Sequence, residues 1–183
     1  MTDMPRAKLA HFGFYVRDLP KMEDFYINIL GLIVTDRGVA TDVRPDLVFM
    51  SAEPGEHHQL VLVSGRPEDD GFNRVQQISF LVDSLDQLRV LHERLVADQC
   101  NIERCITHGI AWSIYFRDPE DNRVEVYCHT PWHVPQPHSH PIDYSLPTAE
   151  IEKLTEAHCR ETEGFMSAAE RQKLVTKMMA ADA

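Results

Sequence analysis

The sequence has few cysteines and no long apolar run. These two absences argue against a secreted disulfide-rich protein and against a membrane protein. No stretch reaches the roughly 18 apolar residues of a membrane span, and Met1 to Lys8 contain no apolar stretch of signal-peptide length. The cysteines form no Cys-x-x-Cys pair and are too sparse for a secreted disulfide scaffold. We therefore expect a cytoplasmic protein that does not enter membranes, with free thiols at Cys100, Cys105, Cys128 and Cys159.

Positive charge is also scarce. Lys and Arg number 18 against 29 Asp and Glu, which gives a formal net charge of -11 at pH 7. Binding to nucleic acid or to an anionic membrane requires a surplus of basic residues, so neither partner is expected. A chain of 183 residues with 43% hydrophobic content can bury a full core. These properties favour a soluble globular protein whose partner is a small molecule or another protein.

One sequence pattern occurs twice. The segments from His11 to Leu19 and from Gln77 to Leu85 each begin with a polar side chain that can bind a metal, continue with period-two alternation, and then change to helical periodicity. Pro20 and Gly31 are typical of the start and end of a helix. In the second copy Ser84 and Gln87 form a capping-box pattern before a stripe of leucines, Leu85, Leu88, Leu91 and Leu95.

Three more strands are predicted after each helix, so each copy forms one helix with a four-stranded, mostly antiparallel sheet. The turn from Asp118 to Asn122 joins the last two strands in a hairpin. The result is an α+β fold of paired βαβββ modules, at about residues 8–64 and 75–129. The predicted strands are Leu9 to Val16, Ile33 to Asp36, Asp46 to Ala52, Gln59 to Val63, Gln77 to Val82, Ile102 to Cys105, Trp112 to Arg117, and Arg123 to Cys128.

Alternation along these strands assigns side chains to the two faces of the sheet. The bulky face of the first strand, with Phe12, Phe14 and Val16, is expected to pack against the helix. The opposite face collects polar side chains from both copies, and a mixed sheet that curves around this face would form a cavity for a ligand. The polar residues expected there are His11, Gln77, Tyr115 and Glu125.

Residues 130–183 lie outside the two modules. Thr130 to Pro137 is a Pro-rich arm, and two helices are predicted after it, one from Thr148 and one that opens at Ser167 with Glu170. We expect this extension to form a lid on the domain or a clamp on a neighbouring subunit, with Trp132 and Tyr144 as its anchors. A homodimer or larger homo-oligomer is also expected. The histidines of the region, His129, His133, His138 and His140, are interpreted as a solvated loop and not as a metal site.

Three motifs between Lys8 and His129 carry a resemblance to a known superfamily. They are His11 with Asp18 and Leu19, the helix end from Tyr26 to Leu32, and the hairpin from Tyr115 to Glu125. In these motifs the chain resembles the vicinal oxygen chelate superfamily, which includes glyoxalases, epimerases, antibiotic resistance proteins and type I extradiol ring-cleaving dioxygenases. The resemblance implies paired βαβββ modules around a divalent metal.

The chain is most similar to single-domain extradiol dioxygenases, which hold Fe(II) with two His and one carboxylate. The resemblance places these metal ligands at His11, Gln77 and Glu125, with Gln77 in the position of a family His. A neutral amide oxygen keeps the ligand charge but softens the preference for iron. The expected metal is therefore Fe(II), with Mn(II), Zn(II) and Mg(II) as alternatives.

The same resemblance implies three catalytic residues. His58 falls where these enzymes have an acid/base His, and Tyr115 and His108 would hydrogen-bond the substrate oxygens. Each residue also has an ordinary interpretation: His58 as a solvated strand end, Tyr115 as a wall residue and His108 as a loop residue. Likewise, His11 fits a half-buried strand residue, and Gln77 fits a hydrogen-bonded wall residue.

The function implied is that of a metal-dependent ring-cleaving dioxygenase in aromatic compound catabolism, with O2 and a catechol or related aromatic diol as substrates. Two alternatives stay open. One is a non-catalytic, resistance-type protein of the same fold that binds a small molecule. The other is a glyoxalase- or epimerase-like enzyme in which Glu125 is both metal ligand and base.

Overall fold

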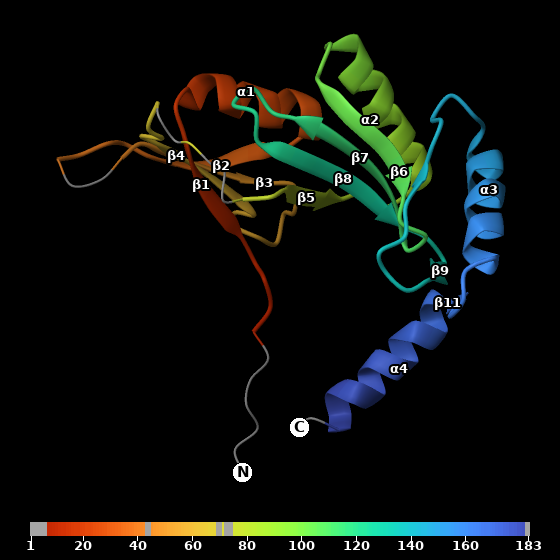
Figure 1. Ribbon diagram of the computed structural model, residues 1–183. Coiled ribbons are helices and arrows are strands. Elements are labelled where there is room, and N and C mark those ends of the chain that lie inside the picture. Colours follow the sequence, from red (N-terminus) through yellow and green to blue (C-terminus); the bar gives the residue numbers. More distant parts are fainter. Residues whose placement is uncertain (1–6, 43–44, 69–70, 72–74, 182–183) are drawn as a thin grey trace. The chain divides into compact units, whose positions relative to one another are not determined.

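The computed structural model describes residues 7–42, 45–68, 71 and 75–181, and these residues form two compact units (Figure 1). The N-terminal unit contains residues 7–77 together with 117–123. The C-terminal unit contains residues 78–116 and continues from residue 124 through the extension. The second helix-and-sheet module and the extension therefore belong to one compact unit.

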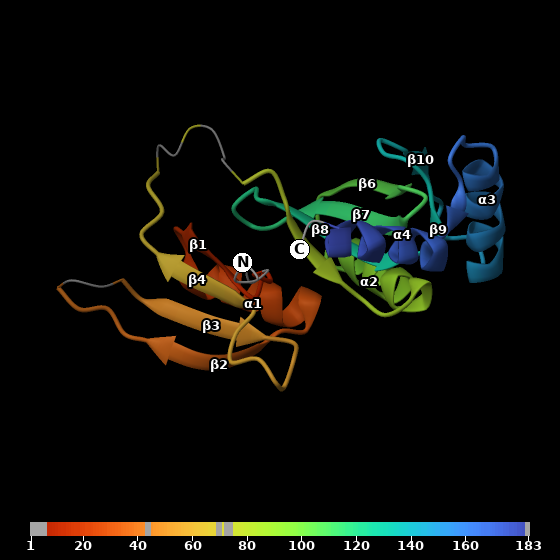
Figure 2. The ribbon, with the colours of Figure 1, turned by 90° about the horizontal axis from the view of Figure 1, so that it is seen from below.

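The N-terminal unit is one helix and a four-stranded sheet. Figure 2 shows its strands side by side in the order β1-β4-β3-β2, with β1 parallel to β4 and the other neighbours antiparallel. The predicted start and end signals are confirmed, because Pro20 lies in the first turn of the helix and Gly31 ends it with a left-handed φ of 72°. The Asp18 side chain caps the start by accepting a hydrogen bond from Lys21 N. The elements are β1 (Phe12–Val16), α1 (Leu19–Leu30), β2 (Ile33–Gly38), β3 (Leu47–Ser51) and β4 (Leu60–Ser64).

The C-terminal unit repeats this arrangement. Its sheet has the order β10-β6-β7-β8-β5, in which β10 (His140–Pro141) comes from the extension. The first strand of the module, β5, is again parallel to its last strand, β8. Ser84 caps the helix by accepting a hydrogen bond from Gln87 N, and the leucine stripe is buried. The module consists of β5 (Ile78–Leu81), α2 (Leu85–Ala97), β6 (Ile102–Thr107), β7 (Ala111–Arg117) and β8 (Arg123–His129). The predicted α+β fold of paired βαβββ modules is thus confirmed.

Burial along β1 and β5 follows the predicted alternation. In β1 the Val16 side chain is fully buried, whereas Tyr15 is 60% exposed. The Phe14 ring lies 6.2 Å from the Tyr26 ring of α1, which places the bulky face of β1 against the helix. In β5, Ile78 is buried and its neighbour Ser79 points to the opposite face. Each sheet therefore has one helix-covered face.

The extension is folded onto the C-terminal unit. Its elements are β9 (Trp132–His133), β10 (His140–Pro141), α3 (Thr148–Arg160), β11 (Met166–Ser167) and α4 (Ala168–Ala181). Strand β10 adds a fifth strand to the sheet, with His140 opposite Thr107 of β6. The predicted capping box opens α4, because Glu170 N donates to Ser167 Oγ and Ser167 N donates to Glu170 Oε2.

One prediction for the extension is wrong. His138 and His140 are half-buried, and the ring of His140 stacks on that of His158 at 4.1 Å, so this stretch is not a solvated loop. The expected anchors pack within the unit, with Tyr144 buried and the Trp132 ring 6.1 Å from the Trp112 ring. Alternation along a segment cannot predict such packing, because the partners are distant in sequence. None of the helices in the described ranges combines the length and the apolar character of a membrane span.

Candidate metal and substrate site

Two of the predicted site residues lie together in the N-terminal unit. His11 immediately precedes β1 and His58 lies just before β4, and the parallel pairing of these strands brings the two rings to a centroid distance of 4.4 Å. His11 is exposed and His58 is half-exposed. Adjacent imidazoles at a strand end offer nitrogen donors or acceptors to a ligand.

His58 has further aromatic neighbours. The Nδ1 atoms of His57 and His58 are 2.8 Å apart, and the Phe49 ring lies 5.2 Å from the His58 ring. Partial burial lowers the pKa of His58, and the neighbouring His11 and His57 lower it further. His58 therefore favours the neutral imidazole, which can accept a proton.

Glu125 provides a buried carboxylate in the C-terminal unit. It lies in β8 with 7% of its surface exposed, and Ser79 Oγ donates a hydrogen bond of 2.6 Å to Glu125 Oε2. The register of β5 and β8 places these two residues opposite each other. A buried carboxylate requires partners, and a cation is one that would satisfy it.

Tyr115 and His108 join this carboxylate. The Tyr115 hydroxyl lies 2.9 Å from His108 Nε2, and it also hydrogen-bonds Glu125. Burial raises the pKa of Tyr115 well above its usual value, and the bond to Glu125 raises it further, so the phenol stays protonated. The Arg104 guanidinium lies 4.4 Å from the centre of the Tyr115 ring. These residues form a continuous polar cluster.

The predicted metal ligands are divided between the units. His11 and Gln77 belong to the N-terminal unit, where Gln77 is half-buried just before β5, and Glu125 belongs to the C-terminal unit. No group of three His, Cys, Asp or Glu side chains in the described part of the chain is placed to hold a metal ion. The predicted set contains only two such side chains, since its third member is the Gln77 amide.

Sequence reasoning did not include Ser79 and Arg104 among the site residues. Alternation from the buried Ile78 puts Ser79 on the polar face of β5, but its bond to Glu125 depends on the pairing of β5 with β8. Arg104 approaches Tyr115 because β6 pairs with β7 at a register shift. Both contacts follow from strand register, which a single sequence does not specify.

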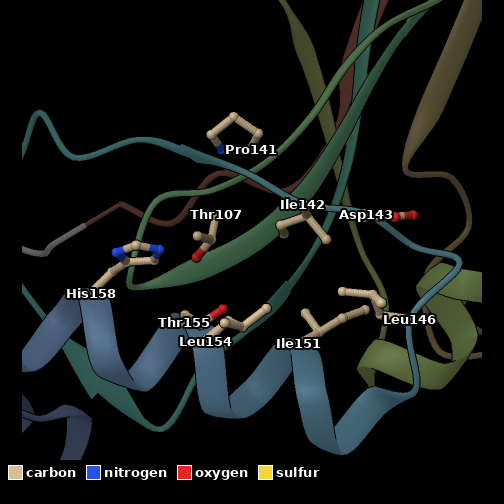
Figure 3. Close-up of a pocket in the computed structure, with 9 residues that line it drawn as sticks. All are labelled: Thr107, Pro141, Ile142, Asp143, Leu146, Ile151, Leu154, Thr155 and His158. Atoms are coloured by element: carbon tan, nitrogen blue, oxygen red, sulfur yellow. The ribbon is translucent and has the colours of Figure 1, made fainter.

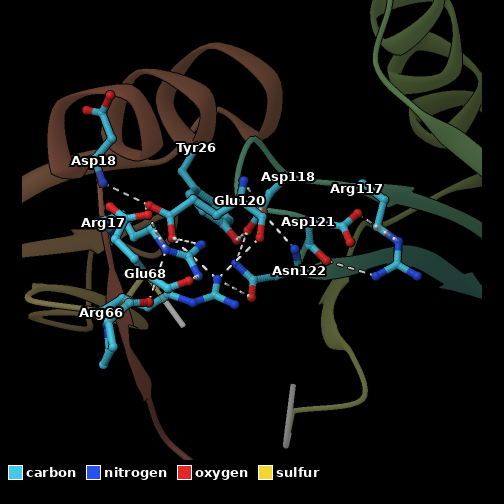
Figure 4. Close-up of polar contacts among 11 residues, drawn as sticks. Arg17, Asp18, Tyr26, Arg66, Glu68, Arg117, Asp118, Glu120, Asp121 and Asn122 are labelled. Atoms are coloured by element: carbon cyan, nitrogen blue, oxygen red, sulfur yellow. Dashed lines mark hydrogen bonds and ion pairs between the residues drawn. The ribbon is translucent and has the colours of Figure 1, made fainter. Parts of the chain in front are cut away.

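A second polar cluster fixes the hairpin turn between β7 and β8 (Figure 4). Asp118 is buried and accepts hydrogen bonds from the Tyr26 hydroxyl at 3.2 Å and from the Asn122 amide at 2.8 Å. Glu120 accepts bonds from the backbone N–H groups of Arg17 and Asp18, at 2.6 and 2.9 Å. All of these residues belong to the N-terminal unit, so the turn is part of that unit.

A small cavity lies in the C-terminal unit between α3 and the segment after β10 (Figure 3). Its volume is about 60 Å³, whereas an engineered cavity that binds benzene measures about 150 Å³. An aromatic diol would not fit. No predicted site residue lines this cavity, whose walls are Thr107, Pro141, Ile142, Asp143, Leu146, Ile151, Leu154, Thr155 and His158.

The cysteines take no part in these clusters and are free. Burial raises the pKa of Cys105 to about 11 and that of Cys128 to about 12. Because the thiolate is the reactive form, buried protonated thiols are poor nucleophiles. The predicted free thiols are confirmed, and the polar residues carry the chemistry of the site.

Two curated relatives are biphenyl-2,3-diol 1,2-dioxygenases from Rhodococcus globerulus. Biphenyl-2,3-diol 1,2-dioxygenase 3 is 30% identical over 135 residues, and biphenyl-2,3-diol 1,2-dioxygenase 2 is 27% identical over 130 residues. Each alignment covers 69% of this chain and 64% of the relative, so the chain spans less than two thirds of their length.

Solved structures share the fold at lower identity. A glyoxalase/bleomycin resistance protein/dioxygenase domain from Frankia sp. EAN1pec has 23% identity and a TM-score of 0.55, with 69% of this chain and 94% of that chain covered. The fosfomycin resistance protein FosX from Listeria monocytogenes, complexed with Mn(II) and sulfate, has 20% identity and a TM-score of 0.52, with 69% and 95% covered. Residues 8–126 match the family model of the Glyoxalase/Bleomycin resistance protein/Dioxygenase superfamily, and the chain belongs to this superfamily.

Proposed function

We propose that the protein is a metal-dependent dioxygenase of the extradiol type that acts on a catechol or a related aromatic diol. The observation that carries this proposal is the cluster of Glu125, Tyr115 and His108, a buried carboxylate with a protonated phenol and an imidazole. The pair of His11 and His58 supplies imidazoles just before the first residues of β1 and β4. Similarity to two biphenyl-2,3-diol 1,2-dioxygenases supports the substrate class.

The proposed ligand set for a divalent metal is His11, Gln77 and Glu125. One imidazole nitrogen, one amide oxygen and one carboxylate oxygen suit such an ion, and the buried Glu125 fits because its charge needs a counter-charge. A divalent ion bound there would supply positive charge for an anionic diol and a centre for its reaction with O2. Fe(II) is the first candidate, and the Gln77 amide extends the range to Mn(II), Zn(II) and Mg(II).

The side chains around this set have separate roles in the proposal. His58, with its lowered pKa, accepts a proton from a diol hydroxyl or returns it later. The Tyr115 hydroxyl and His108 Nε2 orient a substrate oxygen through hydrogen bonds. Ser79 holds the Glu125 carboxylate in one rotamer.

The test is anaerobic purification with Fe(II), Mn(II) or Zn(II), followed by metal analysis and oxygen uptake with a panel of aromatic diols. We expect bound metal and oxygen uptake with at least one diol. Glu125→Ala should abolish metal binding, whereas Glu152→Ala on the exposed side of α3 should leave it unchanged. An absence of oxygen uptake with every metal would overturn the dioxygenase proposal, and unchanged metal content in Glu125→Ala would overturn the ligand assignment.

One observation favours a second candidate, a binding protein without catalysis. Gln77 stands where the extradiol pattern has an imidazole, and a fosfomycin resistance protein shares the fold. Gln77→His separates the two candidates. We expect this substitution to increase the iron retained after gel filtration and to increase oxygen uptake with it. Diol binding without oxygen uptake, in both the parent and Gln77→His, would favour the binding protein.

A further inference from the structure

Residues 130–147 comprise the Pro-rich segment and the residues that follow it up to α3, and they are called the arm from here on. The arm contacts the loop that carries His108. The Gln136 side chain donates a hydrogen bond of 2.8 Å from Nε2 to the carbonyl oxygen of His108. Its Oε1 atom accepts a bond of 3.2 Å from His138 N. The carbonyl oxygen of His138 lies 3.0 Å from His108 Nδ1. The arm therefore holds both the backbone and the ring of His108.

The contact with the His138 carbonyl determines which ring nitrogen of His108 carries hydrogen. A carbonyl oxygen only accepts hydrogen bonds, so His108 Nδ1 must be the protonated nitrogen of the neutral ring. The other nitrogen, Nε2, is then bare and lies 2.9 Å from the Tyr115 hydroxyl. Nε2 is thus a hydrogen-bond acceptor that faces the Tyr115 hydroxyl.

The hydroxyl of Tyr115 links His108 to the carboxylate. It lies 2.9 Å from His108 Nε2 and also hydrogen-bonds Glu125. With hydrogen on Nδ1, Nε2 can only accept, so the phenol is the donor in the bond between Tyr115 and His108. The tautomer of His108 therefore sets the direction of this bond.

Close packing at Gly109 shows that the loop and the arm meet at contact distance. Gly109 has a φ of +73°, and a Cβ atom built on it would lie 2.4 Å from Val134 Cγ2 and 3.0 Å from His138 Cδ2. The Thr130 hydroxyl donates a 2.5 Å bond to the carbonyl oxygen of Gly109. Only glycine fits this backbone conformation and this approach without displacing the arm.

We infer that Gln136 is a positioning residue, and that the arm fixes His108 in the Nδ1–H tautomer so that Nε2 faces the Tyr115 hydroxyl as a hydrogen-bond acceptor. Its value for catalysis rests on the proposed function, in which Tyr115 and His108 orient the substrate. The tautomer itself does not depend on metal, diol or O2. This assigns the extension a role in the chemistry of the site, in addition to covering the edge of β6.

The test is the tautomer of His108, measured by long-range proton–nitrogen NMR of ¹⁵N-histidine-labelled full chain near pH 8, with His108→Asn to assign the signals. We expect Nδ1–H in the parent protein. Gln136→Glu keeps an acceptor for His138 N but removes the donor to the His108 carbonyl, and should shift the tautomer ratio about fivefold towards Nε2–H. Gln136→Leu should do the same, and Gln172→Glu in the exposed part of α4 should not.

Folding is checked by the fluorescence of Trp112 and Trp132, both in the C-terminal unit. An Nε2–H tautomer in the parent, or an unchanged tautomer in folded Gln136→Glu and Gln136→Leu, would overturn the inference. Where oxygen uptake is found, these variants should lower kcat on the order of tenfold with little change in KM. A normal tautomer response without oxygen uptake would instead overturn only the proposed function.

Discussion

The two modules share one strand order and one register, yet they place different side chains at equivalent positions. In the N-terminal unit Gly13 of β1 lies opposite Val61 of β4, and in the C-terminal unit Ser79 of β5 lies opposite Glu125 of β8. The same backbone pairing thus holds an apolar contact in one module and a hydrogen-bonded carboxylate in the other. Duplication repeats the scaffold, and a few substitutions on the polar face differentiate the chemistry.

The helices show the same kind of difference. Tyr26 of α1 and His92 of α2 occupy equivalent positions relative to the helix caps. The Tyr26 hydroxyl donates to Asp118 of the hairpin turn, whereas the His92 ring packs against the Tyr144 ring of the arm at 5.3 Å. Each helix therefore fixes one segment that lies outside its own βαβββ sequence, the first by a hydrogen bond and the second by ring contact.

The largest expected effect is the loss of the Asp118 carboxylate. Asp118→Ala leaves the Tyr26 hydroxyl, the Asn122 amide and the backbone N–H groups of residues 120 and 122 without their acceptor. We expect the free energy of unfolding to fall by about 3 kcal/mol or more, because several buried donors lose their partner together. Asp121→Asn in the same turn is the control, since that side chain is 84% exposed. Urea unfolding of both variants measures the difference, and equal midpoints would refute the role of Asp118.

A matched pair of tyrosines tests the helix comparison. Tyr26→Phe removes a buried bond to a carboxylate and should cost about 1.5–3 kcal/mol. Tyr144→Phe should be neutral or slightly stabilising, because the buried Tyr144 hydroxyl has no hydrogen-bond partner among the described residues. Hydrogen exchange of amides in α1 and α2 locates each effect. Equal losses in both variants would contradict the difference between the two helices.

Ser79→Ala tests the pair that distinguishes β5 from β1. Loss of the 2.6 Å bond frees the Glu125 carboxylate to rotate, so the affinity of the proposed metal site should fall about 10-fold or more. Ser145→Ala, an exposed position in the extension, serves as the control. Competition with a coloured chelator measures the affinity, and an unchanged value for Ser79→Ala would show that this hydroxyl does not orient a ligand.

The strands, the helix caps and the buried stripe of α2 could be predicted from the sequence, because period and capping are local properties. The partners of the hairpin turn could not be, since Asp118 binds Tyr26 far away in the chain. The pairing of β10 with β6 could not be predicted either, because it joins segments that are distant in sequence.

The candidate site also has a part that the sequence predicts and a part that only the structure shows. Alternation placed Glu125 and Tyr115 on one face of the sheet, and the structure joins them in one cluster. The link from Tyr115 to His108 and on to the arm depends on the loop at Gly109, where close approach and a positive φ meet. Such loop contacts carry no periodic signal, so the role of Gln136 emerges only from the folded chain.

The smallest expected effect is a pH dependence confined to one helix. Burial lowers the pKa of His92 below its ordinary value of 6.5, and the nearby Asp143 and Glu93 only partly oppose this shift. Above that value His92 is neutral in both the folded and the unfolded state. As pH falls below 6.5, the unfolded state takes up the proton first, so stability is lost until the pH passes the lower pKa of the folded state. The equivalent Tyr26 has a raised pKa and stays neutral throughout this range.

His92→Phe should therefore flatten the acid side of the stability profile of the C-terminal unit by less than about 1 kcal/mol, because His92 is only half-buried. Both tryptophans lie in that unit, so urea unfolding followed by tryptophan fluorescence at pH values from about 5 to 8 reports on it directly. His129→Gln, at an exposed position, is the control. A profile that is equally steep in His92→Phe would assign the acid sensitivity to the half-buried His138, whose pKa burial and the neighbouring histidines also lower.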